Sequence, residues 1–350
     1  MAIPFRNEGS EGSEGSEGSE GSEGSEGSSA NTFALSGVSA YAGSITSPLL
    51  TRALWTTQGE ITRGIAGIGD ADLSLRKLDI KQGLEHWSRD IRARQYAFEL
   101  CSCLHFDATS RDVGELWALD NGTIAVVAGN PKFSAPCSSV AKLARPLYDY
   151  LGAHAGAPGD PLAAELQRVF DRAALREDRS NEILTQVAVP NAFFAMVLNL
   201  QPGRRRYTYE LMSAALNLAS VAGQRFKHHF RVVRPADRSS LVQPLLLTPG
   251  HGSYPAGHAT QCYALAFVLS ELLKYSVLPK TQQDEMNNEL GKLAYRISEN
   301  RVVAGLHYMP DIEQGGELGK KLGAYLVGKT LVGDSALNWL WEKAKDEWKS

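Results

Sequence analysis

The sequence lacks several features that would assign it to a membrane or secretory class. No apolar run reaches the roughly 18 residues that a membrane-spanning helix requires. The first residues, 1–7, lack the charged and then apolar pattern of a secretory signal peptide. These absences favour a soluble protein. They leave its compartment open, with a slight balance toward the cytoplasm.

Cysteine is also scarce. The four cysteines, at positions 101, 103, 137 and 262, form no C-x-x-C pair and show no zinc-finger spacing. A disulfide framework and a structural zinc site are therefore not indicated. Since unpaired cysteines are commonly buried, we expect reduced thiols in the core.

The formal net charge of −3 conceals a mildly basic body. Residues 8–28 are seven repeats of Glu-Gly-Ser, and without their seven glutamates the charge becomes +4. A basic body suits an anionic ligand. The arginines at 204–206 also raise the possibility of nucleic-acid binding, but no recognition module accompanies them, so no nucleic-acid partner is predicted.

The domain organisation follows from composition and periodicity. Residues 1–29 form a low-complexity tail that cannot build a core and is expected to be disordered. Residues 30–350 are predicted to form a single α-helical domain, with N-terminal helices in 30–200 and an active-site bundle in 201–335. Residues 30–70, rich in Gly, Ser and Thr, are expected to wrap the surface.

Helical spacing of apolar residues predicts an all-α fold built from helical bundles. The predicted helical segments are 73–104, 140–151, 162–175, 183–200, 207–230, 259–275, 281–301 and 312–332. Asp120-Asn121-Gly122, followed by the β-prone run 123–127, is the one hairpin-like spot, so at most a small β-hairpin is expected.

The first of three chemistry-bearing segments runs from Lys227 to Pro235. Lys227 and Arg234 are seven positions apart, about two helical turns, and can share a helix face. Pro235 disfavours helix at Arg234, which places this arginine at a helix end. Two cations there suit an anion with several oxygens, although a solvated basic helix end is the simpler interpretation of this segment alone.

The second segment runs from His251 to Ala259. A Pro-x-Gly loop leads directly into an apolar helix, and free backbone N–H groups at a helix start form an anion site. Gly257 allows close approach of the backbone to a ligand, and His258 can exchange a proton with it. An ordinary helix start is the structural alternative.

The third segment runs from Asn300 to Asp311. Arg301 and His307 would point to different sides of an unbroken helix, but Gly305 and Pro310 predict a helix end, a turn and a new helix start. Asp311 follows His307 by about one turn and can accept its other ring N–H. A buried structural His–Asp pair is the alternative.

In order, these segments match the pattern K-x6-R-P, P-S-G-H and S-R-x5-H-x3-D. This pattern resembles the superfamily of vanadium-dependent haloperoxidases and type 2 phosphatidic acid phosphatases. The match is close over residues 227–315. The resemblance implies that Lys227, Arg234, Arg301 and the Gly257 N–H hold the oxygens of vanadate or phosphate.

The resemblance also implies roles for the remaining residues. His307 would be the ligand of vanadium, or the phosphorylated nucleophile of a phosphatase. His258 would be the acid–base histidine, and Asp311 would orient His307. Two positions depart from the pattern. Ala256 replaces a serine, which removes one hydroxyl contact worth about 1–3 kcal/mol to a charged acceptor, and Asn300 replaces the serine before Arg301.

Both a peroxidase and a phosphatase could use this chemistry, because vanadate and phosphate are similar tetrahedral anions. His251 lies seven residues before His258, and algal vanadium bromoperoxidases have a second histidine at a similar spacing. The run 253–261 also resembles the sequence of these algal enzymes. We therefore expect a haloperoxidase that uses vanadate, hydrogen peroxide, a halide (bromide or iodide rather than chloride) and a small organic acceptor. The alternatives are a soluble phosphatase acting through phosphohistidine at His307 and a degenerate oxyanion-binding protein. The resemblance further implies a homo-oligomer.

Overall fold

The computed structural model describes residues 83–119, 124–127, 130–133, 137–149, 160–187, 190–331, 333 and 335–349. The predictions for residues 1–29 and 30–70 lie outside these ranges, as does the beginning of the predicted helix 73–104. Among the described residues, no helix is both long enough and apolar enough to cross a membrane.

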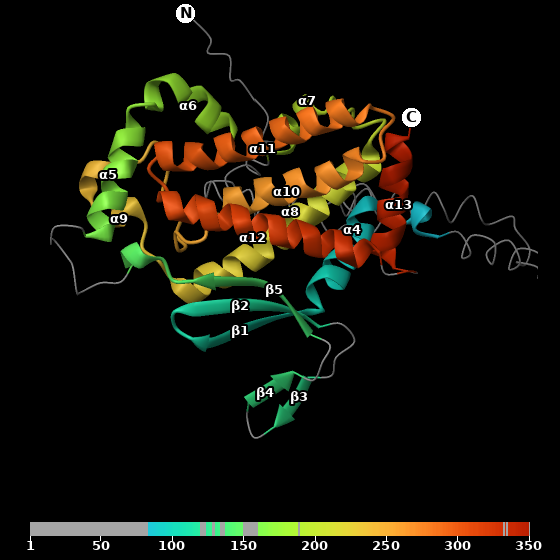
Figure 1. Cartoon of the computed structure of the whole chain (residues 1–350), viewed down its shortest axis with the longest axis horizontal. Helices are drawn as coiled ribbons and strands as arrows, with labels where there is room; N and C mark the ends of the chain where they lie inside the picture. Colours follow the sequence, from blue (N-terminus) through green and yellow to red (C-terminus); the bar gives the residue numbers. More distant parts are fainter. Residues whose placement is uncertain are drawn as a thin grey trace, which may run out of the picture.

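Helices dominate the described chain (Figure 1). The α-helices are α4 (Arg89–Cys101), α5 (Pro161–Ala173), α6 (Arg176–Thr185), α7 (Asn191–Val197), α8 (Arg206–Phe230), α9 (Pro235–Arg238), α10 (Gly257–Leu273), α11 (Lys280–Val303), α12 (Met309–Thr330) and α13 (Ala336–Trp348). Short 3₁₀ helices are η3 (Leu84–His86), η4 (Leu147–Asp149) and η5 (Ser240–Val242). The strands are β1 (Leu104–Ser110), β2 (Val113–Leu119), β3 (Ile124–Val127), β4 (Asn130–Phe133) and β5 (Cys137–Ala144).

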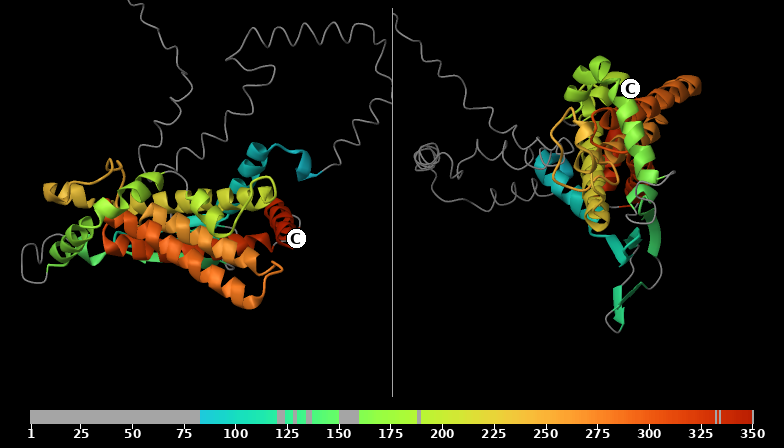
Figure 2. Two further views of the ribbon diagram at one scale, coloured as in Figure 1. Left: turned by 90° about the horizontal axis from the view of Figure 1, so that it is seen from above. Right: turned by 90° about the vertical axis from the view of Figure 1, so that its left-hand side faces the viewer.

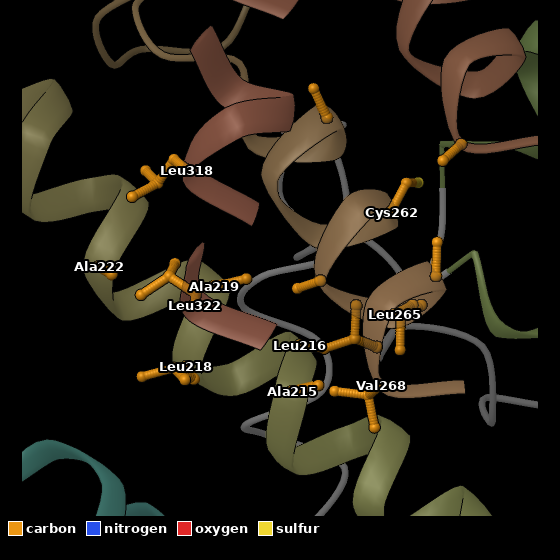
Figure 3. Packing of buried hydrophobic residues seen from close by; sticks show 14 of the residues in the cluster. Ala215, Leu216, Leu218, Ala219, Ala222, Cys262, Leu265, Val268, Leu318 and Leu322 are labelled. Carbon is orange, nitrogen blue, oxygen red and sulfur yellow. The ribbon is translucent and has the colours of Figure 1, made fainter. Parts of the chain in front are cut away.

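The core lies between the long helices α8, α10 and α12. Leu216 and Ala219 of α8, Leu265 of α10, and Leu318 and Leu322 of α12 interdigitate there with little or no exposure (Figure 3). Helix α10 is buried along most of its length, and its sequence is correspondingly apolar rather than amphipathic. This central helix begins at the chemistry-bearing segment 251–258, so core packing fixes the position of that segment.

Small residues bring α12 unusually close to α10. A Cβ atom on Gly319 would lie 2.3 Å from the carbonyl oxygen of Thr260, and one on Gly315 would lie 2.6 Å from that of Ala256. Only glycine permits such an approach of two backbones. The contact at Ala256 ties the start of α10 to the first turns of α12, where Asp311 lies.

An antiparallel sheet in the order β1-β2-β5 packs beside the bundle (Figures 1 and 2). Phe106 of β1 contacts Phe226 of α8 edge-on, with ring centroids 4.9 Å apart. Strand β5 runs against α12 and leads into η4, which carries Tyr148. Strands β3 and β4 form a separate two-stranded hairpin in the region where the sequence suggested one.

The mostly helical fold is confirmed, and the helices predicted at 162–175, 207–230, 259–275, 281–301 and 312–332 are present with small shifts at their ends. The helix predicted at 140–151 is wrong, because this segment pairs with β2 as strand β5 and then forms η4. The single helix predicted at 183–200 is also wrong: α6 ends at Thr185, and α7 begins after Pro190. The β1-β2-β5 sheet exceeds the small hairpin expected from the sequence.

Candidate oxyanion site

Lys227 lies in the last turn of α8 and is 1% exposed. Its Nζ donates to the carbonyl oxygens of Gly252, at 2.9 Å, and Ser253, at 3.3 Å. The prediction that Lys227 and Arg234 share a helix face is wrong. Helix α8 ends at Phe230, Arg231 takes a left-handed conformation with φ of 51°, and Arg234 is the N-cap of the next helix, α9.

Arg234 is nevertheless brought to the same loop as Lys227. Its Nε donates to the His251 carbonyl at 3.0 Å, and its Nη1 donates to the Leu306 carbonyl at 2.9 Å. The same Nη1 lies 3.3 Å from Nε2 of His307, and Nη2 lies 3.2 Å from Nδ1 of His251. This fully buried guanidinium therefore joins the loop before α10 to the loop before α12.

The break between Arg301 and His307 occurs where the sequence predicts it. Helix α11 ends at Val303, α12 begins at Met309, and Gly305 between them has φ of +82°. A side chain on Gly305 would be strained in this conformation, and its Cβ would lie 2.8 Å from Arg176 Nη2. Within the turn, the Leu306 N–H donates to the Arg301 carbonyl at 3.0 Å. The Leu306 peptide units thus bridge Arg301 and Arg234.

The imidazole of His307 is held by a contact between one ring nitrogen and the Asp311 carboxylate. Its Nδ1 lies 3.1 Å from Asp311 Oδ2, and both side chains are fully buried. An ionised carboxylate can only accept, so Nδ1 carries the proton. In the neutral imidazole Nε2 then carries the lone pair, which agrees with Arg234 Nη1 as a donor on that side. Nε2 is thus the ring nitrogen with its lone pair on the side of Arg234.

Asp311 receives hydrogen bonds from four groups. Oδ2 accepts from Ser253 Oγ at 2.6 Å, from the Tyr308 N–H at 3.0 Å and from His307, while Oδ1 accepts from the Tyr148 hydroxyl. Burial raises the pKa of Asp311, but the hydrogen bonds and charge of His307 and the bonds from Ser253 and Tyr148 outweigh it, so the pKa lies below its usual value. Asp311 therefore stays ionised.

Ser253 and Tyr148 are site-supporting residues that the sequence reasoning missed. Ser253 Oγ also lies 3.2 Å from His307 Nδ1, so one hydroxyl touches both members of the pair. Its place in the loop before Gly257 was a usable signal. Tyr148 is more than 160 positions from Asp311 and lies in a segment mistaken for helix, so nothing in the sequence connected them. Burial, followed by the Asp311 charge, raises the pKa of Tyr148 well above its usual value, so its hydroxyl remains a donor.

The start of α10 supplies backbone donors beside this pair. Ala256 is the N-cap, and Gly257 and His258 are the first helical residues. Amide groups in a first turn have no acceptor within the helix and favour negative charge. The Ala256 N–H donates to the Asp311 carbonyl at 3.0 Å, which ties the α10 start to the α12 start. Alanine provides no side-chain cap here.

Arg301 and His258 are both anchored at the carboxyl end of α6. Arg301 Nη2 donates to the Ile183 carbonyl at 3.2 Å, and His258 Nε2 lies 3.0 Å from the Gln186 carbonyl. Both side chains are fully buried. The carbonyls at a helix end carry partial negative charge, which suits these donors.

A cavity of about 630 Å³ opens on one side of the cluster, lined in part by Lys227, Arg234 and His251. Three buried cations, Lys227, Arg234 and Arg301, outnumber the Asp311 carboxylate. Lys227 and Arg234 meet at the loop 251–253, and Arg234 also reaches Leu306 and His307. Arg301 and His258 are held instead at the carboxyl end of α6. Buried cations and a helix start such as that at Gly257 are groups that suit a tetrahedral oxyanion.

Comparison with known proteins yields partial structural likenesses. No family model and no curated protein matches the chain. A transmembrane PAP2-type phosphatidylglycerolphosphate phosphatase from Bacillus subtilis is 18% identical, with a TM-score of 0.40, covering 51% of this chain and 92% of that one. A bacterial vanadium-dependent iodoperoxidase is 21% identical, with a TM-score of 0.38, covering 49% of each chain. Neither likeness assigns a family or an activity to this chain.

Proposed function

We propose that this protein is a vanadium-dependent haloperoxidase that oxidises bromide or iodide with hydrogen peroxide to hypohalous acid. The observation that supports this proposal best is the arrangement around His307. Its Nδ1 is committed to Asp311, and the lone pair on Nε2 faces Arg234 within a buried cationic cluster. These residues belong to the motif in 227–315 that resembles the superfamily of vanadium haloperoxidases and type 2 phosphatidic acid phosphatases.

The donor set fits vanadate. His307 Nε2 would be its protein ligand, and Lys227, Arg234, Arg301 and the Gly257 N–H would hold its oxygens. Buried cations and first-turn amides are the donors that oxyanions prefer. Bound vanadate would supply a Lewis-acid centre that activates hydrogen peroxide without changing its own oxidation state.

The reaction needs a proton donor besides the oxyanion cradle. Oxidation of a halide by hydrogen peroxide to hypohalous acid consumes one proton and releases water. His258 is assigned this role because it lies in the first turn of α10, directly after Gly257. Asp311 keeps the His307 proton on Nδ1, and the three cations neutralise negative charge that would otherwise oppose the approach of a halide.

The preference for bromide or iodide over chloride is assigned to His251. Its Nδ1 lies 3.2 Å from Arg234 Nη2, and the residue lines the 630 Å³ cavity beside the cradle. A small organic acceptor would receive the halogen in or near this cavity.

A phosphatase is the second candidate, because the same proton placement makes His307 Nε2 a nucleophile. Nε2 would attack phosphorus while His258 protonates the leaving oxygen, and water would then hydrolyse the phosphohistidine. The third candidate is an oxyanion-binding protein without either activity. For this candidate, the loss of the serine hydroxyl at position 256, where Ala256 now lies, would matter most.

One experiment separates the three. Purified protein is loaded with orthovanadate and given hydrogen peroxide and bromide, iodide or chloride, and halogenation of a reporter is followed; hydrolysis of an aryl phosphate is measured in parallel without vanadate. We expect vanadate-dependent bromination that disappears in His307→Ala and persists in His105→Ala, a histidine on β1 outside the cluster. Phosphate release without bromination would contradict the proposal, as would neither activity.

A further inference from the structure

Asn300 replaces the serine that precedes Arg301 in the superfamily pattern, and the structure shows which groups its side chain contacts. It is fully buried near the end of α11. Nδ2 donates to Gln186 Oε1 at 2.8 Å and to Glu182 Oε1 at 2.9 Å, and Oδ1 accepts from Arg179 Nη1 at 3.2 Å. Both amide hydrogens and the amide oxygen are therefore directed at α6 and the residue that caps it.

Gln186 connects Asn300 to the site. It is the C-cap of α6 and is 1% exposed. Its side chain is held at both ends, with Oε1 accepting from Asn300 and Nε2 donating to Glu182 Oε1 at 3.0 Å. Its backbone carbonyl faces His258 Nε2 at 3.0 Å. Asn300 is therefore one of the groups that hold the residue whose carbonyl faces His258.

The contact with Gln186 determines which ring nitrogen of His258 carries the proton. A backbone carbonyl can only accept, so Nε2 must be the N–H. In the neutral ring, Nδ1 is then the nitrogen that takes a proton and later returns it. A displaced Gln186 carbonyl would leave both tautomers accessible and the ring free to tilt.

We propose that Asn300 and Gln186 are positioning residues for His258, holding it as the Nε2–H tautomer through the chain Asn300–Gln186 carbonyl–His258. Arg301, the next residue along α11, is anchored to the Ile183 carbonyl of the same helix end. Two consecutive residues of α11 therefore use α6 as a common support, one for the oxyanion cradle and one for the acid–base group. A serine at position 300 has one hydroxyl donor and cannot make both Nδ2 bonds.

The test uses Asn300→Asp, which keeps the side-chain shape but removes both donors and places a carboxylate beside Glu182. Asn288→Asp, at an exposed position of the same helix, is the matched control for added charge. Imidazole ¹⁵N shifts of the histidine-labelled full chain report the tautomer, and His258→Asn assigns the signal. We expect the Nε2–H form in the wild type and the control, and a mixture of tautomers in Asn300→Asp.

Kinetics supply a second readout, which rests on the proposed function. For Asn300→Asp we expect a fall in kcat of about 10-fold, part of the 10²–10⁴-fold that a positioned acid–base group contributes. The Kd for inorganic vanadate should change less than about 3-fold, because the Arg301 anchor does not pass through Gln186. Asn300→Ser, which keeps one donor, should give an intermediate tautomer ratio and rate, and it replaces Asn300→Asp in the test if that variant fails to fold.

An unchanged His258 tautomer in folded Asn300→Asp or Asn300→Ser would overturn the positioning role. A fall in vanadate affinity matching the fall in kcat would also overturn it, since that indicates collapse of the whole site. The tautomer measurement needs no turnover. Absence of halogenation and of phosphate release in the wild type would therefore contradict the proposed function without deciding this inference.

Discussion

Replacing Asp311 with asparagine removes the charge that keeps the His307 proton on Nδ1. The substitution preserves shape, so its effect isolates the charge and the acceptor capacity of one oxygen. An amide oxygen placed at the Oδ2 position can still face Ser253, Tyr308 N–H and His307 Nδ1, and the new NH₂ would then meet the Tyr148 hydroxyl, which can reverse and accept. The bonds survive in a neutral, weaker form.

The magnitude follows from these contacts. A hydrogen bond to a charged group contributes about 1.5–3 kcal/mol and a neutral one about 0.5–1.5, so each of the three Oδ2 bonds weakens by about 1 kcal/mol. Relief of the desolvation that burial imposes on the carboxylate offsets part of this loss. We expect the free energy of unfolding to fall by about 1–3 kcal/mol. Each kcal/mol corresponds to a fall in Tm of about 2–4 °C.

The assay combines urea unfolding with vanadate binding. Asp311→Asn should weaken vanadate binding at least about 10-fold, because the competing tautomer with the proton on Nε2 cannot bond to vanadium. The control is Asp149→Asn, which removes another largely buried carboxylate, one paired with Arg145 and Arg238. It should change stability but leave the Kd for vanadate near the wild-type value. Wild-type vanadate affinity in Asp311→Asn would refute the orienting role of Asp311.

Four further predictions concern the same structure. The folded-state pKa of Asp311 lies below its ordinary value of 3.8, so the ionised form stabilises the fold above pH 3.8. This stabilisation is lost as the pH falls through the folded-state pKa. The difference in unfolding free energy between wild type and Asp311→Asn, measured with urea, should therefore close in acid. Ser253→Ala, which removes the 2.6 Å bond to Asp311, should lower the free energy of unfolding by about 1–3 kcal/mol; an unchanged value would mean that this bond adds nothing. Gly319→Ala should destabilise the folded protein by about 1–3 kcal/mol, because its Cβ would lie 2.3 Å from the Thr260 carbonyl oxygen. Gly328→Ala on the same helix, with open space around it, should be neutral or slightly stabilising in thermal unfolding. Ala256→Ser should stabilise α10 by about 0.5–2 kcal/mol as an N-cap and tighten the Kd for vanadate or phosphate, and a looser Kd would show that no hydroxyl is accommodated there.

Much of the bundle and of the site could be predicted because the relevant signals are local. Long amphipathic or apolar stretches predict α8, α10, α11 and α12. Gly305 with Pro310 predicts the break between α11 and α12, where the structure has it. The Asp311 contact follows from a one-turn spacing. These patterns need no knowledge of distant parts of the chain.

The remaining features depend on pairings that the sequence does not display. Residues 140–144 become strand β5 because they pair with β2, a contact between distant segments that overrides a helix-like pattern. Lys227 and Arg234 meet through the loop 251–253 and not through a shared helix face, because the left-handed Arg231 ends α8 early. Tyr148 and Gln186 reach Asp311 and His258 only through tertiary packing.

A crystal structure grown with orthovanadate would show directly whether His307 binds vanadium. We expect vanadium bonded to Nε2 of His307, with the vanadate oxygens on Lys227, Arg234, Arg301 and the Gly257 N–H. We expect His258 to remain on the Gln186 carbonyl. Vanadate bound elsewhere on the chain, or bonded to a residue other than His307 at millimolar concentration, would contradict it.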